Sequence, residues 1–142
     1  MKKLSFLLMI VAIMTPFMVC NAQSTSQKSA NSQVVEVLYF HGGMRCAACV
    51  AMEKFGKQAI DSVFSKELQN GSLVFRSIDL MEPEGEKLGD RYEVASSSFL
   101  IIGFRDGEET VTDMTAFGFR NAKDYRTVFK QGVIDEVNKL LK

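Results

Sequence analysis

The sequence has no excess of charge, only one histidine and no internal repeat. Its 142 residues carry 17 Lys and Arg against 17 Asp and Glu, so no net field draws the chain towards nucleic acid or an acidic surface. No phosphate-binding loop, nucleic-acid patch or serine triad stands out. A chain of this length is expected to form one domain, whose chemistry must then depend on few residues.

The N-terminal stretch predicts export. Residues 1–3 are short and basic, residues 4–19 are apolar with few interruptions, and Cys20-Asn21-Ala22 ends in a small residue. This is the layout of a secretory signal peptide over residues 1–22, and its apolar part is too short for a comfortable membrane span. Cleavage before Cys20 is the alternative, and it would leave Cys20 as the acylated N-terminus of a lipoprotein. We therefore expect a periplasmic or otherwise extracytoplasmic protein, attached to a membrane only through such an anchor.

Residues 23–33, QSTSQKSANSQ, contain no apolar residue larger than alanine. A segment of this composition cannot bury enough apolar surface to fold, so we expect a disordered linker. Folding is expected to begin at Val34. Residues 34–142 are long enough to enclose one hydrophobic core.

Hydrophobic patterning after residue 33 predicts alternating strands and helices. Residues 34–40 are β-branched and aromatic, as in a strand covered on both faces, and a helix from Cys46 to about Leu68 is stopped by Asn70-Gly71. The order strand, helix, strand, helix, strand, strand, helix predicts a mixed sheet with helices on both faces. The other expected elements are strands over residues 72–80, 99–104 and 109–117, the last two joined by an Asp106-Gly107 turn, and helices over residues 82–92 and 121–142, the first with Pro83 in its first turn.

Two cysteines follow the first strand. After Gly42-Gly43 the chain reads MRCAAC, which places Cys46 and Cys49 at the start of the long helix. Two thiols three residues apart can close a disulfide or share a metal, and the free amides at a helix start favour a thiolate. The sequence therefore predicts chemistry at this point.

The CAAC motif in this setting resembles the thioredoxin family. The resemblance covers residues 34–142 and implies an α/β fold with a mixed central sheet of about four strands flanked by about three helices. More narrowly, the stretches CAAC, MEPEGEKLGDRYEV, SSSFLII and FGFRNAKDYRTVFKQGV resemble exported thioredoxin-like proteins described as nitrophenyl compound nitroreductase subunits. This resemblance implies a thiol-disulfide redox protein without a cofactor, or a non-catalytic subunit of a reductase system.

Two positions depart from the thioredoxin pattern. The place of the cis-proline that faces the cysteines is taken by Ser96-Ser97-Ser98, and no proline follows Pro83. The place of the buried acid, six residues before Cys46, is taken by Phe40.

Under the redox hypothesis Cys46 is the nucleophile, because it lies nearer the helix start, and Cys49 resolves the mixed disulfide. The expected partner is a protein thiol or disulfide, or a redox donor. Arg45 is a candidate for stabilising the Cys46 thiolate, and a solvated side chain is the equal alternative for it. His41 could relay a proton, although a bond to the backbone is the commoner role of a histidine at a strand end.

Three alternatives remain for the pair. The stretch from Gly43 to Val50 resembles the GM-x-CxxC loop of heavy-metal-associated domains, so Cys46, Cys49 and Met44 could hold Cu(I) or a thiophilic metalloid, with Met52 near them. An inert disulfide is the second alternative, although so small a loop constrains the unfolded chain little. A domain that serves only as an interaction surface is the third.

Overall fold

The computed structural model describes residues 33–142. The expected signal peptide, Cys20 and all of the expected linker except its last residue lie outside the described residues, and these stay predictions. That last residue, Gln33, donates a hydrogen bond from its side-chain amide to the carbonyl of Leu140. The described part thus begins beside the C-terminal helix.

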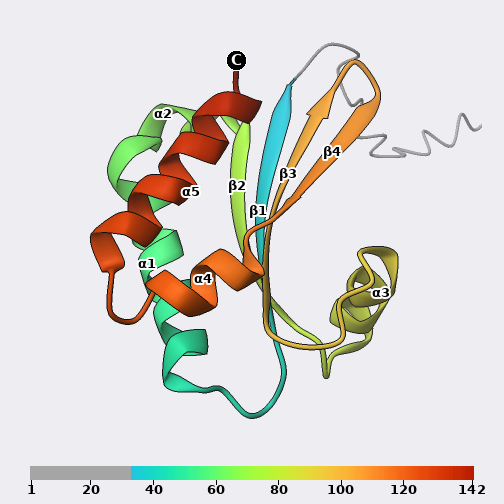
Figure 1. Ribbon diagram of the computed structural model, residues 1–142. Coiled ribbons are helices and arrows are strands. Elements are labelled where there is room, and N and C mark those ends of the chain that lie inside the picture. Colours follow the sequence, from blue (N-terminus) through green and yellow to red (C-terminus); the bar gives the residue numbers. More distant parts are fainter. Residues whose placement is uncertain (1–32) are drawn as a thin grey trace, which may run out of the picture.

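Four strands form one mixed sheet in the order β2-β1-β3-β4 (Figure 1). The strands are β1 (Val34–His41), β2 (Leu73–Asp79), β3 (Ser98–Arg105) and β4 (Glu108–Asp113). β1 is parallel to β2 and antiparallel to β3, and β3 is antiparallel to β4. This is the strand order of a thioredoxin-like fold, which confirms the expected fold class. It also brings the end of β1, the end of β2 and the start of β3 to one edge of the sheet.

Helices cover both faces of the sheet (Figure 1). One face carries α1 (Ala47–Val63), α2 (Ser65–Asn70), α4 (Thr115–Asn121) and α5 (Arg126–Leu140), and the other carries α3 (Pro83–Arg91). None of the helices within residues 33–142 has the length and apolar character needed to cross a membrane.

The central strand β1 separates two hydrophobic cores. Because successive side chains of a strand point to opposite faces, Val35, Val37 and Tyr39 belong to the core under α1 and α5, and Leu38 and Phe40 belong to the core under α3. All five side chains are fully buried. The prediction of a strand covered on both faces is therefore confirmed.

The long helix predicted from Cys46 to about Leu68 is in fact two helices. The backbone leaves helical geometry at Phe64, with φ −111° and ψ 39°, and the Phe64 side chain is only 3% exposed. Burying this ring against the core therefore coincides with the end of α1. The predicted stop at Asn70-Gly71 is confirmed, since Gly71 ends α2 in the left-handed region, with φ 77°.

The strand predicted over residues 109–117 is wrong beyond Asp113. The Asp113 carboxylate accepts a hydrogen bond from the Thr115 backbone N–H at 2.8 Å, and the Thr115 hydroxyl accepts one from the Phe99 N–H at 3.0 Å. These two bonds turn the chain into α4, whose Gly118 lies directly against the Met52 side chain of α1. The last helix accordingly begins at Arg126 rather than at residue 121, and the described chain has five helices rather than about three.

Two local predictions hold. Asp106 and Gly107 both have positive φ, 52° and 85°, as a tight Asp-Gly hairpin between β3 and β4 requires. Pro83 opens α3, followed by Glu84 and Glu86 in its first turn. There the missing proline N–H is no loss, and acidic side chains suit the positive end of the helix.

Candidate functional site

The cysteine pair lies where β1 passes into α1. Cys46 is the N-cap residue of α1 in extended geometry, and its sulfur accepts a hydrogen bond from the Cys49 N–H at 3.0 Å. The two sulfurs form a disulfide, with the Cα atoms 5.0 Å apart. A sulfur at this position faces the free amides of the first helical turn, and these amides stabilise negative charge once the bond is reduced.

The two cysteines differ in exposure. Cys46 is exposed, whereas Cys49, one turn into the helix, is only 6% exposed and packs inside the protein. A bulky reactant can therefore reach the Cys46 sulfur and not the Cys49 sulfur. This is the geometry expected for an attacking and a resolving thiol, although the roles themselves stay predictions.

His41 contacts the backbone and a neighbouring aromatic ring at the end of β1. Its Nδ1 lies 3.3 Å from the carbonyl oxygen of Gly42, and its ring stacks on Tyr39 with centroids 6.0 Å apart. The residue is half-buried at the end of β1. These contacts correspond to the backbone-bound histidine that the sequence favoured over a proton relay.

Arg45 is held by an acidic partner that sequence reasoning did not single out. Its guanidinium forms an ion pair with Glu53 of α1 and lies over the ring of Tyr39, 5.4 Å from the centroid. The hydrogen bond to Glu53 raises the pKa of Arg45 above its ordinary value. The positive charge of Arg45 is thus paired with the Glu53 carboxylate. The proposed stabilisation of a Cys46 thiolate by Arg45 stays a prediction.

Glu53 also accepts a hydrogen bond from the Ser77 hydroxyl of β2. Burial by itself raises the pKa of Glu53, but the bonds from Ser77 and Arg45 outweigh it, and the net pKa is lowered. The carboxylate is therefore ionised at neutral pH. The spacing of four residues after Cys49, which places both on one helix face, could have pointed to Glu53 from the sequence.

The two methionines around the pair lie in opposite environments. Met44 is 96% exposed in the loop after β1, while Met52 is fully buried in the core. Within residues 33–142 no group of three or more His, Cys, Asp or Glu side chains could hold a metal ion. The Cu(I) alternative through Cys46, Cys49 and Met44 stays a prediction.

Both places that depart from the thioredoxin pattern have a residue in the central sheet, Ser98 in β3 and Phe40 in β1. Ser98 opens β3 opposite Phe40 of β1, and the peptide bonds of the described chain include no cis bond. Phe40 is fully buried in the core under α3, on the face of the sheet away from α1. It therefore carries no charge into the cysteine site.

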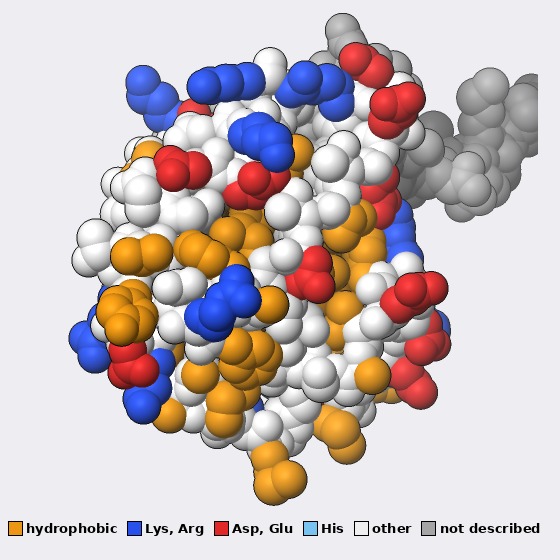
Figure 2. All heavy atoms as spheres, viewed as in Figure 1, with side chains coloured by type: hydrophobic (Ala, Val, Ile, Leu, Met, Phe, Trp, Pro, Cys, Tyr) orange, Lys and Arg blue, Asp and Glu red, His pale blue; other side chains and the backbone are white. Residues whose placement is uncertain are grey.

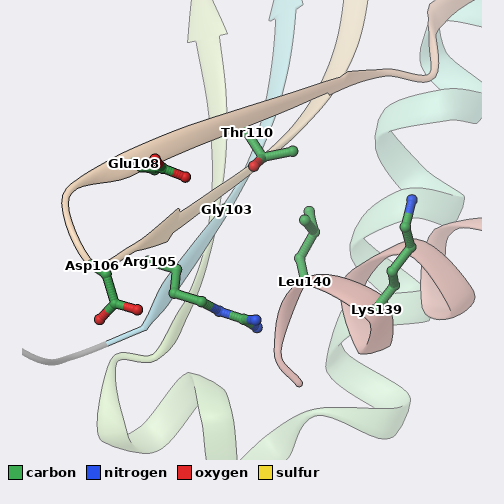
Figure 3. Close-up of a pocket in the computed structure, with 7 residues that line it drawn as sticks. All are labelled: Gly103, Arg105, Asp106, Glu108, Thr110, Lys139 and Leu140. Atoms are coloured by element: carbon green, nitrogen blue, oxygen red, sulfur yellow. The ribbon is translucent and has the colours of Figure 1, made fainter.

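A pocket lies between the β3–β4 hairpin and the end of α5 (Figure 3). It sits where β3 ends, whereas the cysteines follow the edge where β3 begins. Its charged lining is mixed in sign: Arg105, Asp106, Glu108 and Lys139. Because these charges balance and the pocket is remote from the thiols, it is not part of the candidate site.

Two solved structures show a weak likeness to this chain. One solved structure, titled "Structure of a malarial protein", is 17% identical with a TM-score of 0.43, and the match covers 77% of this chain and 99% of that one. A second, titled "Solution structure of a thioredoxin from Thermus thermophilus", is 20% identical with a TM-score of 0.42, and covers 72% of this chain and 75% of that one. No family model and no curated protein matches the chain. The narrower resemblance to nitroreductase subunits therefore stays a prediction, and the thioredoxin-like fold rests on the strand order.

Proposed function

We propose that this protein is an extracytoplasmic thiol-disulfide redox protein in which Cys46 attacks and Cys49 resolves. The observation that carries the proposal is the exposed residue Cys46 at a helix start, joined in a disulfide to the buried Cys49. A thiolate is favoured at that position, and only Cys46 is open to a partner.

The reaction balances as two exchanges. In the reduced protein the Cys46 thiolate attacks one sulfur of a partner disulfide, which forms a mixed disulfide and releases the first partner thiolate. The Cys49 sulfur then attacks Cys46, the internal disulfide forms, and the second partner thiolate leaves. Two electrons pass from the protein to the partner, and the reverse sequence oxidises a partner dithiol. The relative reduction potentials of protein and partner set the direction.

Side chains around Cys46 suit a protein partner. Met44 and Met81 are 96% and 75% exposed, and they follow β1 and β2, whose parallel ends meet at the cysteine edge. Figure 2 shows hydrophobic side chains from the middle to the bottom of the visible face, with Lys, Arg, Asp and Glu among them as well as along the top. Flexible, polarisable methionines adapt to varied surfaces.

The proposed location follows from the expected signal peptide over residues 1–22, with the linker over residues 23–33 and the redox domain over residues 34–142. The intact mass of the exported protein tests it. A new N-terminus at Gln23 indicates a soluble form, and an acylated Cys20 indicates a lipid-anchored one. An unprocessed chain that stays in the cytoplasm would contradict the proposal.

Two serine variants test the redox function. Cys49→Ser should accumulate a mixed disulfide between Cys46 and glutathione on exposure to oxidised glutathione, whereas the matched Cys46→Ser should react far more slowly because its remaining thiol is buried. Intact mass after acid quenching measures both. Equal reaction of the two variants, or a wild-type pair that never equilibrates with glutathione buffers, would refute the proposed function.

A further inference from the structure

Glu53 lies on α1, four residues after Cys49, and has no part in the exchanges described so far. Its carboxylate accepts hydrogen bonds from the guanidinium of Arg45, in the loop before α1, and from the hydroxyl of Ser77, in β2. The side chains of Arg45 and Glu53 are each 27% exposed. An acid held this firmly from two sides is positioned rather than freely solvated.

The carboxylate is drawn towards the turn of α1 that holds Cys49. Residues four apart on a helix have Cβ atoms about 5–6 Å apart, and helical side chains lean towards the N-terminus. Glu53 is four residues after Cys49, and its partner Arg45 precedes the helix. The ion pair therefore pulls the Glu53 carboxylate back along the helix towards the buried Cys49 thiol.

We propose that Glu53 accepts the proton of the Cys49 thiol in the resolving step, with Arg45 and Ser77 as positioning residues. This inference rests on the proposed function. The Cys49 proton passes to the Glu53 carboxylate as the Cys49 sulfur attacks Cys46, the internal S–S bond forms, and the partner leaves as a thiolate. In the reverse direction the Glu53 carboxylate takes a proton from solvent and passes it to the Cys49 sulfur as its bond to Cys46 opens.

The surroundings of Glu53 keep it available as a base. The titratable and charged groups around it are Arg45, with Tyr39 beneath the guanidinium, and His41 at the end of β1, which also acts to lower the pKa of Glu53. The lowered pKa of Glu53 keeps it ionised at neutral pH. The same lowering makes it a weak base, so we expect about a tenfold acceleration, below the hundredfold or more of a well-matched general base.

A chromogenic aromatic disulfide, dithiobis(nitrobenzoic acid), separates the two steps. With the fully reduced protein, the first nitrothiobenzoate is released when Cys46 attacks, and the second when Cys49 displaces the aromatic thiol from Cys46. Stopped-flow absorbance therefore reports each thiol separately. Release of a single equivalent by the wild type, or a first phase no faster than that of an unstructured cysteine peptide, would refute the proposed function. The inference about Glu53 is read from the second phase alone.

The variant Glu53→Gln should slow the second phase about tenfold at pH 7 and leave the first phase unchanged. The defect should shrink as the pH rises past about 9, because hydroxide then ionises more of the thiol without help. Asp61→Asn is the matched control, because Asp61 is an exposed acid of the same helix, paired with Lys57. It should leave both phases unchanged.

Equal second phases in Glu53→Gln and wild type, or a defect that persists unchanged above pH 9, would overturn the proposed role. The second outcome would mean that the substitution only disturbs the packing of Cys49. If Glu53→Gln leaves Arg45 unpaired and the protein fails to fold, the double variant Arg45→Met with Glu53→Gln removes both charges. The second phase of this double variant is then compared with that of the wild type, and the same two outcomes would overturn the proposed role of Glu53.

Discussion

Reduction of the Cys46–Cys49 disulfide should cost the fold little stability. The bond joins residues three apart in sequence. The loop-entropy relation gives about 2 kcal/mol for a loop of about four residues at 25 °C, against about 3 kcal/mol for one of about 15 residues. The amide of Cys49 already donates to the Cys46 sulfur at 3.0 Å, and this bond strengthens when the sulfur becomes a thiolate. We therefore expect a loss of at most about 2 kcal/mol.

Urea unfolding of the oxidised protein and of the protein kept reduced measures this difference directly. The double variant Cys46→Ser, Cys49→Ser is the control for the loss of the bond without a thiolate, and it should fall near the reduced protein. A loss above about 4 kcal/mol, or unfolding on reduction, would exceed what loop closure can supply. It would show that the bond is a structural brace, and the redox proposal would lose its basis.

Three further predictions concern packing and pH. Gly85→Ala should destabilise the protein by about 1–3 kcal/mol in urea unfolding, because the added Cβ would lie 1.8 Å from the backbone oxygen of Asp79; an unchanged midpoint would contradict this contact. Phe129→Ala should cost about 3–5 kcal/mol, since the ring is fully buried. Tyr125→Ala, at a side chain 63% exposed, should stay within about 0.5 kcal/mol, and equal losses at both sites would refute the assigned core. Because the pKa of Glu53 is lowered on folding, its carboxylate stabilises the folded protein at pH values above the ordinary pKa of 4.5. This contribution is lost as the pH falls through the folded pKa. The difference in the free energy of unfolding between wild type and Glu53→Gln should therefore narrow below pH 4.5.

Local patterns were sufficient for the cysteine site itself. A β-branched strand followed by two glycines and CAAC predicts a strand, a turn and a helix start. The bounds of β1 and the start of α1 lie within about a residue of these predictions. The Asp106-Gly107 turn and the Gly71 helix stop were also predictable, because each needs a backbone conformation that few residues adopt.

The surroundings of the cysteines were not predictable in the same way. The sequence shows Arg45 only as a neighbour of Cys46, but in the folded protein its guanidinium is paired with Glu53, eight residues away. Ser77, 24 residues from Glu53, donates a hydrogen bond to the same carboxylate. A hydrogen bond across that separation leaves no local pattern. The start of α4 likewise depends on Phe99, which lies 16 residues before Thr115.

The amino-acid sequence alone therefore determined where the thiols stand along the chain, which strand precedes them and which fold class carries them, since period, turn and cap preferences act over a few residues. Only the tertiary structure decided which cysteine is buried, where α1 ends before Phe64, and which groups bind the Glu53 carboxylate. Burial and long-range polar contacts exist only after distant segments pack, so the chemistry that depends on them is set by the fold.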